Sequence, residues 1–508
     1  NQKTNPNQPP GPIPLSHFNG WIDGSIVGLY LLATMVAGLW VRRYVSKVEH
    51  FLVAGREMNL YLGIASLAAT EFGIITCMYA SEAGYTRGFS GATPGICQAV
   101  AMLVIGYTGF CVKPLRASGV MTLPELFEKR FGKRVRWLAG VVIVLGGLLN
   151  MGVFLKIGGD FLCAVCGWDT GYLIPVMGGL LVLVAIYTIL GGMLSVLVTD
   201  FLQFIIMSVG LLSVTLLILH HIGWERLEEA VRVQHGEGGF NPLANAEMGW
   251  SYLIFQIIGN TAATLTWQTT ISRLLSSKDA ATGQRIYTRT SFFFVCRWLV
   301  PVLWGVAALA MLGPAGEGES SMMAMPKFLS TFLPVGLMGL MVAAMLAADM
   351  STDSSYMLGW GSVIYNDILA PFRKSRWPEK RAIRWNRCIV ALIGVYLFVF
   401  GLLYEIKGDV WSYLLLSGSV YLSSMSVLLI SCCYWKRANN WGAVGAIIGG
   451  AGVPMAFLSM EKMTTMAALA ESIGKDNAGI AAFAAAALGM IIGSLVKPRS
   501  HPVLPSET

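Results

Sequence analysis

The chain has 508 residues, of which 55% are hydrophobic and only 13% are charged, and its mean hydropathy is +0.62. Soluble globular domains carry roughly a quarter charged residues, so this composition excludes a soluble module and indicates a polytopic membrane protein. The net charge of +8 could suggest nucleic-acid binding, but the placement of the basic residues explains it without such a partner.

Apolar segments of about 20 residues, the length at which a helix crosses a bilayer, follow one another along the chain. They cover residues 21–41, 60–83, 92–112, 137–162, 172–190, 196–219, 250–272, 290–312, 335–367, 385–404, 411–434, 441–458 and 480–496. We therefore predict an all-α membrane protein with 13 transmembrane helices and no soluble domain of useful size.

An odd number of spans places the two termini on opposite sides of the membrane, and the basic residues indicate which side is cytoplasmic. With the N-terminus outside, the inner segments hold 26 of the 36 Lys and Arg residues and the outer segments eight, while Lys156 and Arg297 fall within spans. Cytoplasmic loops carry the excess of basic residues, so we predict an outside N-terminus and a cytoplasmic C-terminus. The short loops suit a bacterial inner membrane.

Two spans contain interruptions. The span 60–83 has Glu71 and Gly73 at its centre, and the span 250–272 has Gly259 and a polar run, 264–270. Paired interruptions in two halves of a chain are typical of inverted-repeat transporters whose binding site lies near the bilayer midplane. Each of the two interrupted spans begins a group of five successive spans.

This pattern predicts the division of the whole chain. The expected segments are a flexible outer tail (1–20), an extra N-terminal helix with an inner loop (21–59), a first five-helix repeat (60–220), an outer loop (221–249), a second five-helix repeat (250–434), two C-terminal helices (435–496) and a cytoplasmic tail (497–508). The outer tail has no basic region or cleavage site, so the first span is interpreted as a retained anchor.

Neither the cysteines nor the histidines indicate a disulfide framework, a metal site or an enzyme active site. Nine cysteines, an odd number, lie mostly in or beside apolar segments and do not form a disulfide framework. Cys163-x-x-Cys166 is the only suggestive pair, and no second Cys or His pair accompanies it as in a zinc site. We expect no enzyme activity and no cofactor other than a coupling ion.

The segment 347–355 places four hydroxyls and two carboxylates inside an apolar span. Polar groups in hydrocarbon are costly, so such residues indicate a functional site. At about 100° per residue, one helical stripe is formed by Ala348, Ser351, Thr352 and Ser355, with Ser354 at its edge. These neutral oxygens suit a small hard cation better than nucleophilic chemistry. Asp349 and Asp353 lie off the stripe and are expected to line a vestibule or assist cation entry.

Three motifs occur in order along the chain. They are Gly55-Arg56 followed by Ala65-Ser66-Leu67-Ala68-Ala69-Thr70-Glu71-Phe72-Gly73 and Gly84-Tyr85; Tyr187-x-x-x-Gly191-Gly192-x-x-Ser195-x-x-x-Thr199-Asp200-x-x-Gln203; and Met350-Ser351-Thr352, followed by Asp367. Together they resemble the sodium:solute symporter family over about residues 22–458.

The resemblance implies a five-plus-five inverted-repeat (LeuT-like) fold and sodium-coupled import of a small polar solute. The segments 113–116 and 274–277, with Trp267, Gln268 and Arg273, look most like the choline-transporter branch, so the expected solute is a choline-like amine or zwitterion. A sugar or an organic acid such as sialate remains an alternative, and so does a membrane solute sensor with a separate signalling partner. We expect sodium, a small solute and the lipid bilayer as partners, without nucleic acid or an obligate protein partner.

The family's sodium site uses carbonyls of the first broken helix together with a carbonyl and hydroxyls of the eighth helix. The matching positions here are Ala69, Phe72, Ala348, Ser351 and Thr352. A helix break frees backbone carbonyls, which agrees with this assignment. The alternative for the two hydroxyls is hydrogen bonding to their own preceding helical turn.

The resemblance to sialic acid transporters places a second sodium on Asp200, Ser354 and Ser355. The alternative for Asp200 is a solvated charge at the inner end of its span.

Glu71 departs from the choline-like pattern, which has an aromatic residue at this position. Its carboxylate could contact an amine or another part of the solute, take part in sodium or proton coupling, or make a structural hydrogen bond. The other candidates for solute contact are Thr76, Trp267, Gln268 and Lys156. The indole of Trp267 could face a cation, which is worth about 2 kcal/mol when desolvated, or could simply pack. For Lys156, the alternative is neutralisation by Asp160, four residues later on the same helix.

Overall fold

The structure is a computed structural model of the chain and describes residues 18–316, 319–373, 377–404 and 410–497. Throughout these residues the regular secondary structure is helical, apart from one isolated bridge between Met58 and Ser277. Most of the predicted outer tail, up to residue 17, and the cytoplasmic tail from residue 498 lie outside the described residues.

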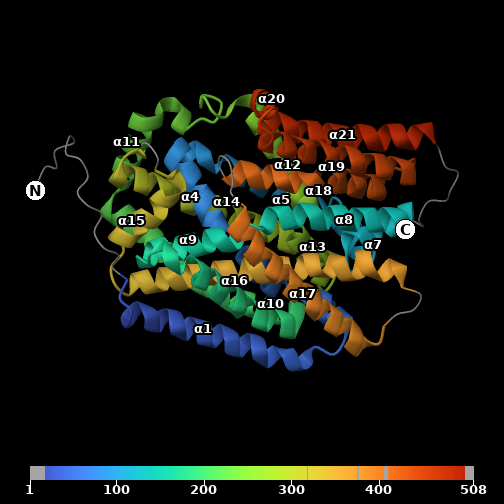
Figure 1. Ribbon diagram of the computed structural model, residues 1–508, viewed down its shortest axis with the longest axis horizontal. Coiled ribbons are helices and arrows are strands. Elements are labelled where there is room, and N and C mark those ends of the chain that lie inside the picture. Colours follow the sequence, from blue (N-terminus) through green and yellow to red (C-terminus); the bar gives the residue numbers. More distant parts are fainter. Residues whose placement is uncertain (1–17, 317–318, 374–376, 405–409, 498–508) are drawn as a thin grey trace, which may run out of the picture.

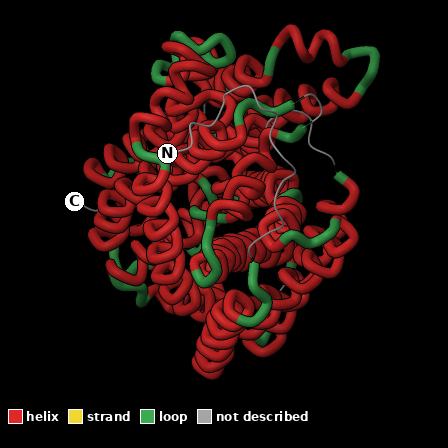
Figure 2. Tube along the Cα trace, turned by 90° about the vertical axis from the view of Figure 1, so that its left-hand side faces the viewer, coloured by secondary structure: helices red, strands yellow, loops and turns green. Residues whose placement is uncertain are grey.

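The longer helices run along one common direction, which is horizontal in Figure 1, and Figure 2 shows the same bundle from the left-hand end of that view. The helices are α1 (Ile22–Val41), α2 (Val48–Val53), α3 (Leu60–Glu71), α4 (Ile74–Arg87), α5 (Thr93–Thr108), α6 (Val112–Ala117), α7 (Leu123–Phe131), α8 (Lys133–Met151), α9 (Phe154–Cys166), α10 (Leu173–His221), α11 (Trp224–His235), α12 (Gly249–Thr266), α13 (Gln268–Ser276), α14 (Ala280–Leu312), α15 (Ala324–Phe332), α16 (Leu337–Val363), α17 (Glu379–Leu403), α18 (Val410–Tyr434), α19 (Asn440–Lys462), α20 (Ala467–Ile473) and α21 (Lys475–Val496).

All the predicted spans coincide with helices. In the described chain, nine stretches are long and apolar enough to cross a membrane by length and composition. Leu173–His221 holds two predicted spans, and Ile74–Thr108 holds most of the span 92–112 together with the second half of the span 60–83, whose first half is α3. Helices α12 and α16 supply the remaining two spans. The segment α10 is divided at Gly192, whose φ of +55° and ψ of −149° are not helical. A positive φ is accessible to glycine at little cost, which explains this residue at the junction.

Both predicted interruptions are present. Helix α3 ends before Phe72, whose φ and ψ are −107° and 74°, and α4 begins two residues later. Helix α12 ends before Trp267, which is extended with φ −62° and ψ 123°, and α13 follows directly. The second break therefore lies in the predicted polar run, while Gly259 is inside α12. Ends of helices leave backbone groups without intrahelical partners, and here those groups lie within the bundle.

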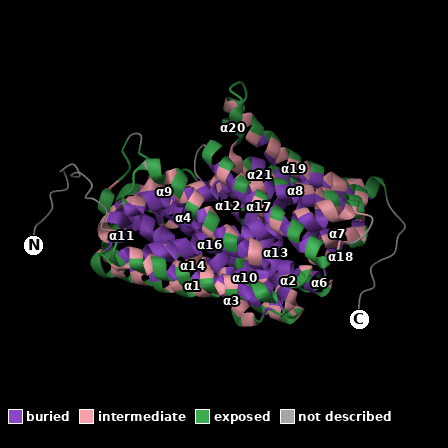
Figure 3. Ribbon diagram, turned by 60° about the horizontal axis from the view of Figure 1, so that its bottom comes forward, coloured by how far each residue is buried: buried purple, intermediate pink, exposed green. Residues whose placement is uncertain are grey.

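Helix α16 lies at the centre of the bundle. Every residue from Met341 to Val363 is buried, including the polar ones. By contrast, the most apolar windows of α1, α19 and α21 are only 22%, 33% and 28% buried, so these helices form the periphery. Figure 3 shows the resulting distribution, with buried residues inside and exposed residues on the outer helices. Because α16 has no exposed face in this stretch, each of its polar groups needs a partner inside the bundle.

Candidate functional site

An open pocket, whose empty space is about 580 Å³ with the adjoining solvent included, lies where the two broken helices meet α16. Its lining residues are Thr70, Glu71, Ile75, Thr76, Tyr79, Gln98, Asn150, Phe154, Asn260, Ala263, Trp267, Arg297, Thr352, Tyr356, Trp411, Leu414, Leu415 and Leu422. Aromatic rings, amides, hydroxyls and one oppositely charged pair thus surround the same space. This mixture is typical of sites that orient a small polar solute.

Glu71 connects the two broken helices. It is the last residue of α3, its side chain is 4% exposed, and its Oε1 accepts hydrogen bonds from Thr269 Oγ1 at 2.6 Å and Thr270 Oγ1 at 3.2 Å. Both threonines belong to the first turn of α13. Its Oε2 lies 3.4 Å from Arg297 Nη1. The carboxylate is therefore partnered at both oxygens before any solute binds.

Arg297, on α14, supplies the positive charge of the cavity. Its Nη2 donates to Tyr79 Oη at 2.8 Å and its Nη1 donates to Gln98 Oε1 at 3.1 Å, in addition to the contact with Glu71. The Nε atom is buried and has no hydrogen-bond partner among the described residues. The guanidinium is therefore fixed at one side of the cavity, and one of its buried donors is unsatisfied in this arrangement.

The aromatic wall is built around Trp267, the residue at the second break. Its Nε1 donates to Tyr356 Oη at 2.9 Å, and its ring stacks on Tyr421 with 5.7 Å between centroids and 24° between planes. Trp360 packs against it edge-on at 6.1 Å. These contacts hold the indole in one orientation, so it presents a rigid apolar surface to the cavity.

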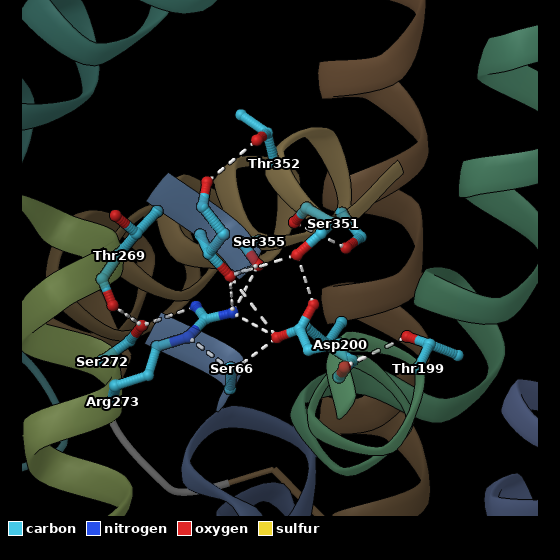
Figure 4. A network of polar contacts seen from close by, with 12 residues as sticks. Ser66, Thr199, Asp200, Thr269, Ser272, Arg273, Ser351, Thr352 and Ser355 are labelled. Atoms are coloured by element: carbon cyan, nitrogen blue, oxygen red, sulfur yellow. Dashed lines mark hydrogen bonds and ion pairs between the residues drawn. The ribbon is translucent and has the colours of Figure 1, made fainter. Parts of the chain in front are cut away.

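Next to the cavity, beyond its lining residue Thr70, an ion pair joins Asp200 of α10 to Arg273 of α13 (Figure 4). Both side chains are fully buried, and Arg273 Nη2 lies 2.9 Å from Asp200 Oδ2. The same guanidinium donates from Nη2 to Thr70 Oγ1 at 2.7 Å and to Ser355 Oγ, and from Nε to Ser66 Oγ at 3.1 Å. Buried charges are tolerated when they are paired and hydrogen-bonded, as here. The alternative that Asp200 is a solvated charge is therefore wrong.

The predicted sodium residues of α16 lie against the first break. Thr352 Oγ1 donates to the carbonyl oxygen of Thr70 at 2.8 Å, and a β-carbon at Gly73 would lie 2.7 Å from that hydroxyl. Ser351 Oγ donates to Asp200 Oδ1 at 2.6 Å. Both hydroxyls therefore point out of their own helix, and hydrogen bonding to the preceding turn does not account for them. Ala69 O accepts from the backbone N of Phe72 at 3.3 Å, at the end of α3.

The residues predicted for a second sodium are only partly brought together. Ser355 Oγ accepts from Thr70 or donates to it at 3.0 Å and contacts Arg273, which also binds Asp200. Ser354 Oγ instead donates to the carbonyl oxygen of Ser351 at 3.1 Å, within its own helix. In this arrangement the guanidinium of Arg273 occupies the space between the carboxylate and the hydroxyl of Ser355.

Three of the five predicted solute contacts, Glu71, Thr76 and Trp267, line the cavity, whereas Gln268 and Lys156 do not. Gln268 is 2% exposed and packs against α16, where a β-carbon at Gly359 would lie 3.3 Å from its Cγ. Helix α9 approaches α17 at Lys156, whose Cβ lies 3.4 Å from the position that a β-carbon would take at Gly401. Asp349 and Asp353 are buried and do not line the cavity either, contrary to the expected vestibule position.

Sequence reasoning missed the two arginines that organise the site. The predicted span 250–272 ends one residue before Arg273 and so leaves this residue to an inner segment, whereas the structure buries it completely in α13. Arg297 lies within a predicted span, and its intramembrane position is the signal that identifies it as a functional candidate. Gln98 belongs to the site because it accepts a hydrogen bond from Arg297, and no pattern in the sequence distinguishes it.

Two broken helices beside a polar central cavity, within a bundle of apolar helices, are typical of secondary transporters of small solutes. Residues 51–450 match the sequence profile of the Sodium:solute symporter family, and the chain belongs to that family. It is therefore an integral membrane protein of the sodium-coupled solute transporters, a family of carriers and not of enzymes.

Known relatives extend over most of the chain. The Sodium/glucose cotransporter 4 of Danio rerio is 26% identical over 482 residues, which cover 86% of this chain and 72% of that protein. The Sodium/myo-inositol cotransporter of Mus musculus is 24% identical over 490 residues, covering 86% of this chain and 67% of its own length. These relatives do not support the predicted choline-transporter branch.

The fold is that of a solved Na⁺-coupled sialic acid symporter in its substrate-bound outward-open state. The TM-score is 0.78 at 18% sequence identity, over 94% of this chain and 99% of the other. The predicted all-α, five-plus-five inverted-repeat fold is thereby confirmed.

Proposed function

We propose that this chain is a sodium-coupled symporter that imports a neutral polyhydroxylated solute, a sugar or a cyclitol, by alternating access. The observation that carries the proposal is the pairing of Glu71 with Arg297 inside the cavity. A cavity without net charge gives a cationic amine no counter-charge, which argues against the choline-like solute. Amide, hydroxyl and charged groups can exchange hydrogen bonds with several hydroxyls, while the Trp267 face covers an apolar side of a ring. The sugar and inositol carriers among the relatives support the same class.

An organic acid is the second candidate, because Arg297 Nε is buried without a partner. A carboxylate that entered the cavity could accept from this donor and compete with Glu71 for the guanidinium. The relationship to a sialic acid symporter is one of fold alone and does not decide between the two classes.

For the coupling ion, we propose sodium bound by the carbonyls of Ala69, Phe72 and Ala348 and the hydroxyls of Ser351 and Thr352. The contact of Thr352 with Thr70 O supports this site, because it brings α16 against the first break. Sodium at this junction would select the arrangement in which α3 and α16 are together, and the same arrangement exposes the cavity to solute. Membrane potential adds about 2.3 kcal/mol per charge per 100 mV to the driving force.

We further propose that a second sodium, if one is used, enters at Asp200, Ser354 and Ser355 only after Arg273 has moved. The outside N-terminus, the cytoplasmic C-terminus, the bacterial inner membrane and the repeat boundaries 60–220 and 250–434 also remain proposals, which rest on the distribution of basic residues and on the paired breaks.

The test is uptake into proteoliposomes under an inward sodium gradient and an inside-negative potential. The labelled panel is glucose, mannose, myo-inositol, sialic acid and choline. We expect sodium-dependent accumulation of one neutral compound. Accumulation of choline alone would overturn the neutral class, and binding of a solute without any accumulation would favour the sensor.

A double-mutant cycle separates the two solute classes. Glu71→Gln and Arg297→Gln each leave a buried charge without its partner, so each should reduce uptake strongly. For a neutral solute, the double variant should recover part of the activity because the cavity is again uncharged. For an organic acid, every variant without Arg297 should stay inactive. Arg232→Gln, at an exposed ion pair on α11, is the matched control.

A further inference from the structure

A second pocket lies where α8 begins, at the end of the bundle that holds α7 (Figure 1). Its empty space is about 800 Å³ with the adjoining solvent included. The first turns of α8 line it together with Pro371 and Phe372, which follow α16, and Val444 of α19. It shares no lining residue with the cavity proposed for the solute.

An ion pair fixes the walls of this pocket relative to one another. Arg136 Nε, on α8, lies 2.8 Å from Asp367 Oδ1, and its Nη2 donates to Asn366 O at 2.7 Å. These contacts hold the start of α8 against the segment that follows α16. Phe372 then packs edge-on against Trp137, with 6.1 Å between ring centroids and 82° between planes. The pocket is therefore built by the packing of the chain.

Two cationic side chains of this pocket have no partner. Lys133 and Arg134 are exposed, and neither makes an ion pair or a hydrogen bond with another described residue. No described lining residue is acidic. The acids of the neighbouring α7 are engaged, Glu128 with Arg136 and Glu125 with a backbone N–H. The pocket thus has two uncompensated positive charges and is complementary to an anion.

The apolar part of the pocket lies one helical turn deeper. Residues four apart share a face of a helix, so Trp137 stands over Lys133 and Leu138 over Arg134, about 5.4 Å further along α8. Val444 is likewise in the second turn of α19, which begins at Asn440. Basic residues at the end of a span with an aromatic ring just inside are typical of the membrane interface.

This order of groups distinguishes between kinds of anion. A free phosphate would meet the two cations and leave the apolar walls without a contact. A molecule with an anionic head and an apolar tail would use both parts. Phe372 is 73% exposed, so apolar surface remains for such a tail to cover.

We propose that this pocket binds one anionic phospholipid, whose phosphate lies beside Lys133 and Arg134. Part of an acyl chain covers Trp137, Leu138 and Val444. Basic pockets between transmembrane helices bind anionic head groups in this way. In the proposed orientation the lipid comes from the cytoplasmic leaflet. It joins α8 to the segment after α16 and to α19, so it should stabilise the folded chain. The inference does not depend on the solute or the coupling ion.

Native mass spectrometry of the purified full chain in detergent tests the charged part. With added phosphatidylglycerol or phosphatidylcholine of the same acyl chains, the wild type should prefer the anionic lipid. In the double variant Lys133→Gln/Arg134→Gln, the Kd for phosphatidylglycerol should rise about tenfold or more, since each basic residue contributes about a fivefold factor in affinity. Lys380→Gln/Arg384→Gln, at exposed positions of α17, is the matched control and should bind as wild type.

The apolar part is tested by filling it. Val444→Trp adds bulk without changing charge and should weaken phosphatidylglycerol binding. Displacement of the lipid by glycerol 3-phosphate at a similar concentration would show a site for a soluble phosphate and overturn the proposal. Equal binding of the two lipids would do the same, as would unchanged lipid binding in the double charge variant. A dimer that is lost in Val444→Trp would assign the pocket to a second copy of the chain.

Thermal unfolding supplies a second readout. Phosphatidylglycerol should raise the Tm of the wild type and of the α17 control, and should raise that of the double charge variant much less. The wild type alone decides the question if the variants do not fold. Its preference for the anionic lipid should weaken as salt rises from about 0.05 to 0.5 M, because salt screens exposed charges. A preference that is unchanged over this range would contradict the assigned role of the two cations.

Discussion

Arg273 and Asp200 form the most completely buried charge pair of the described chain, and its hydroxyl neighbours explain why it is tolerated. Ser66, Thr70 and Ser355 each donate to the carboxylate or accept from the guanidinium. Through these contacts the pair connects α3, α10, α13 and α16, which belong to both predicted repeats. Removing one partner is costly because the other charge stays behind without hydration.

Substituting either charge should therefore destabilise the protein more than substituting an exposed pair. We expect Asp200→Asn and Arg273→Met each to lower the free energy of unfolding by about 3–5 kcal/mol. Thermal unfolding in detergent measures the effect. Arg232→Met, which breaks an exposed pair with Glu228 on α11, should change stability by less than about 1 kcal/mol. Equal effects at the two sites would show that the buried pair is not structural.

The hydroxyls of α16 can be tested for sodium binding one residue at a time. Ser351→Ala and Thr352→Val should each raise the sodium concentration for half-maximal uptake by about tenfold or more, or about 1.4 kcal/mol. Ser362→Ala is the control, because that hydroxyl donates to Gly359 O within the same helix. Sodium titration of solute uptake provides the measurement. An unchanged sodium dependence in both variants would remove these residues from the site.

At the scale of elements, the first break depends on a close contact as well as on backbone conformation. Gly73 immediately precedes α4 and has no side chain to separate it from Thr352 of α16. Helix α16 can therefore approach the free backbone groups between α3 and α4. The second break has no such glycine, and Trp267 occupies it with its ring in the aromatic wall.

This contact predicts the effect of one added methyl group. In Gly73→Ala, the β-carbon would lie 2.7 Å from Thr352 Oγ1, so either the Thr352 hydroxyl or α16 itself must move away from the break. We expect sodium-dependent uptake to fall by about tenfold or more, since misplacement of a binding site by about 1 Å can cost two orders of magnitude in rate. Gly28→Ala on α1 has nothing within 4 Å and should behave as wild type. Normal uptake by Gly73→Ala would mean that α16 is not held against the break.

At the scale of the whole molecule, the helices form one bundle whose two ends carry different charge. Basic residues are concentrated in the predicted inner segments, and α11 with α15 lies at the opposite end from α7 (Figure 1). The positive-inside rule converts this asymmetry into an orientation in the membrane.

Cysteine labelling checks that orientation. Arg226 on α11 and Lys380 on α17 are both exposed and belong to predicted outer and inner segments. In a background with Cys388→Ser, a membrane-impermeant thiol reagent should label Arg226→Cys in intact cells and Lys380→Cys only after the membrane is opened. The reverse pattern would invert the predicted topology.

The sequence by itself determined where the apolar helices, both helix breaks and the polar stripe of α16 lie, because hydropathy and helical periodicity are local properties of the chain. It also identified Glu71 and Trp267, since a charge in a span and an indole in a polar run are visible without a partner. Only the tertiary structure decided which groups pair. Asp200 and Arg273 are 73 residues apart and Glu71 and Arg297 are 226 apart. Whether a buried charge is neutralised, and hence which solute a cavity favours, depends on distances between helices that no local pattern encodes.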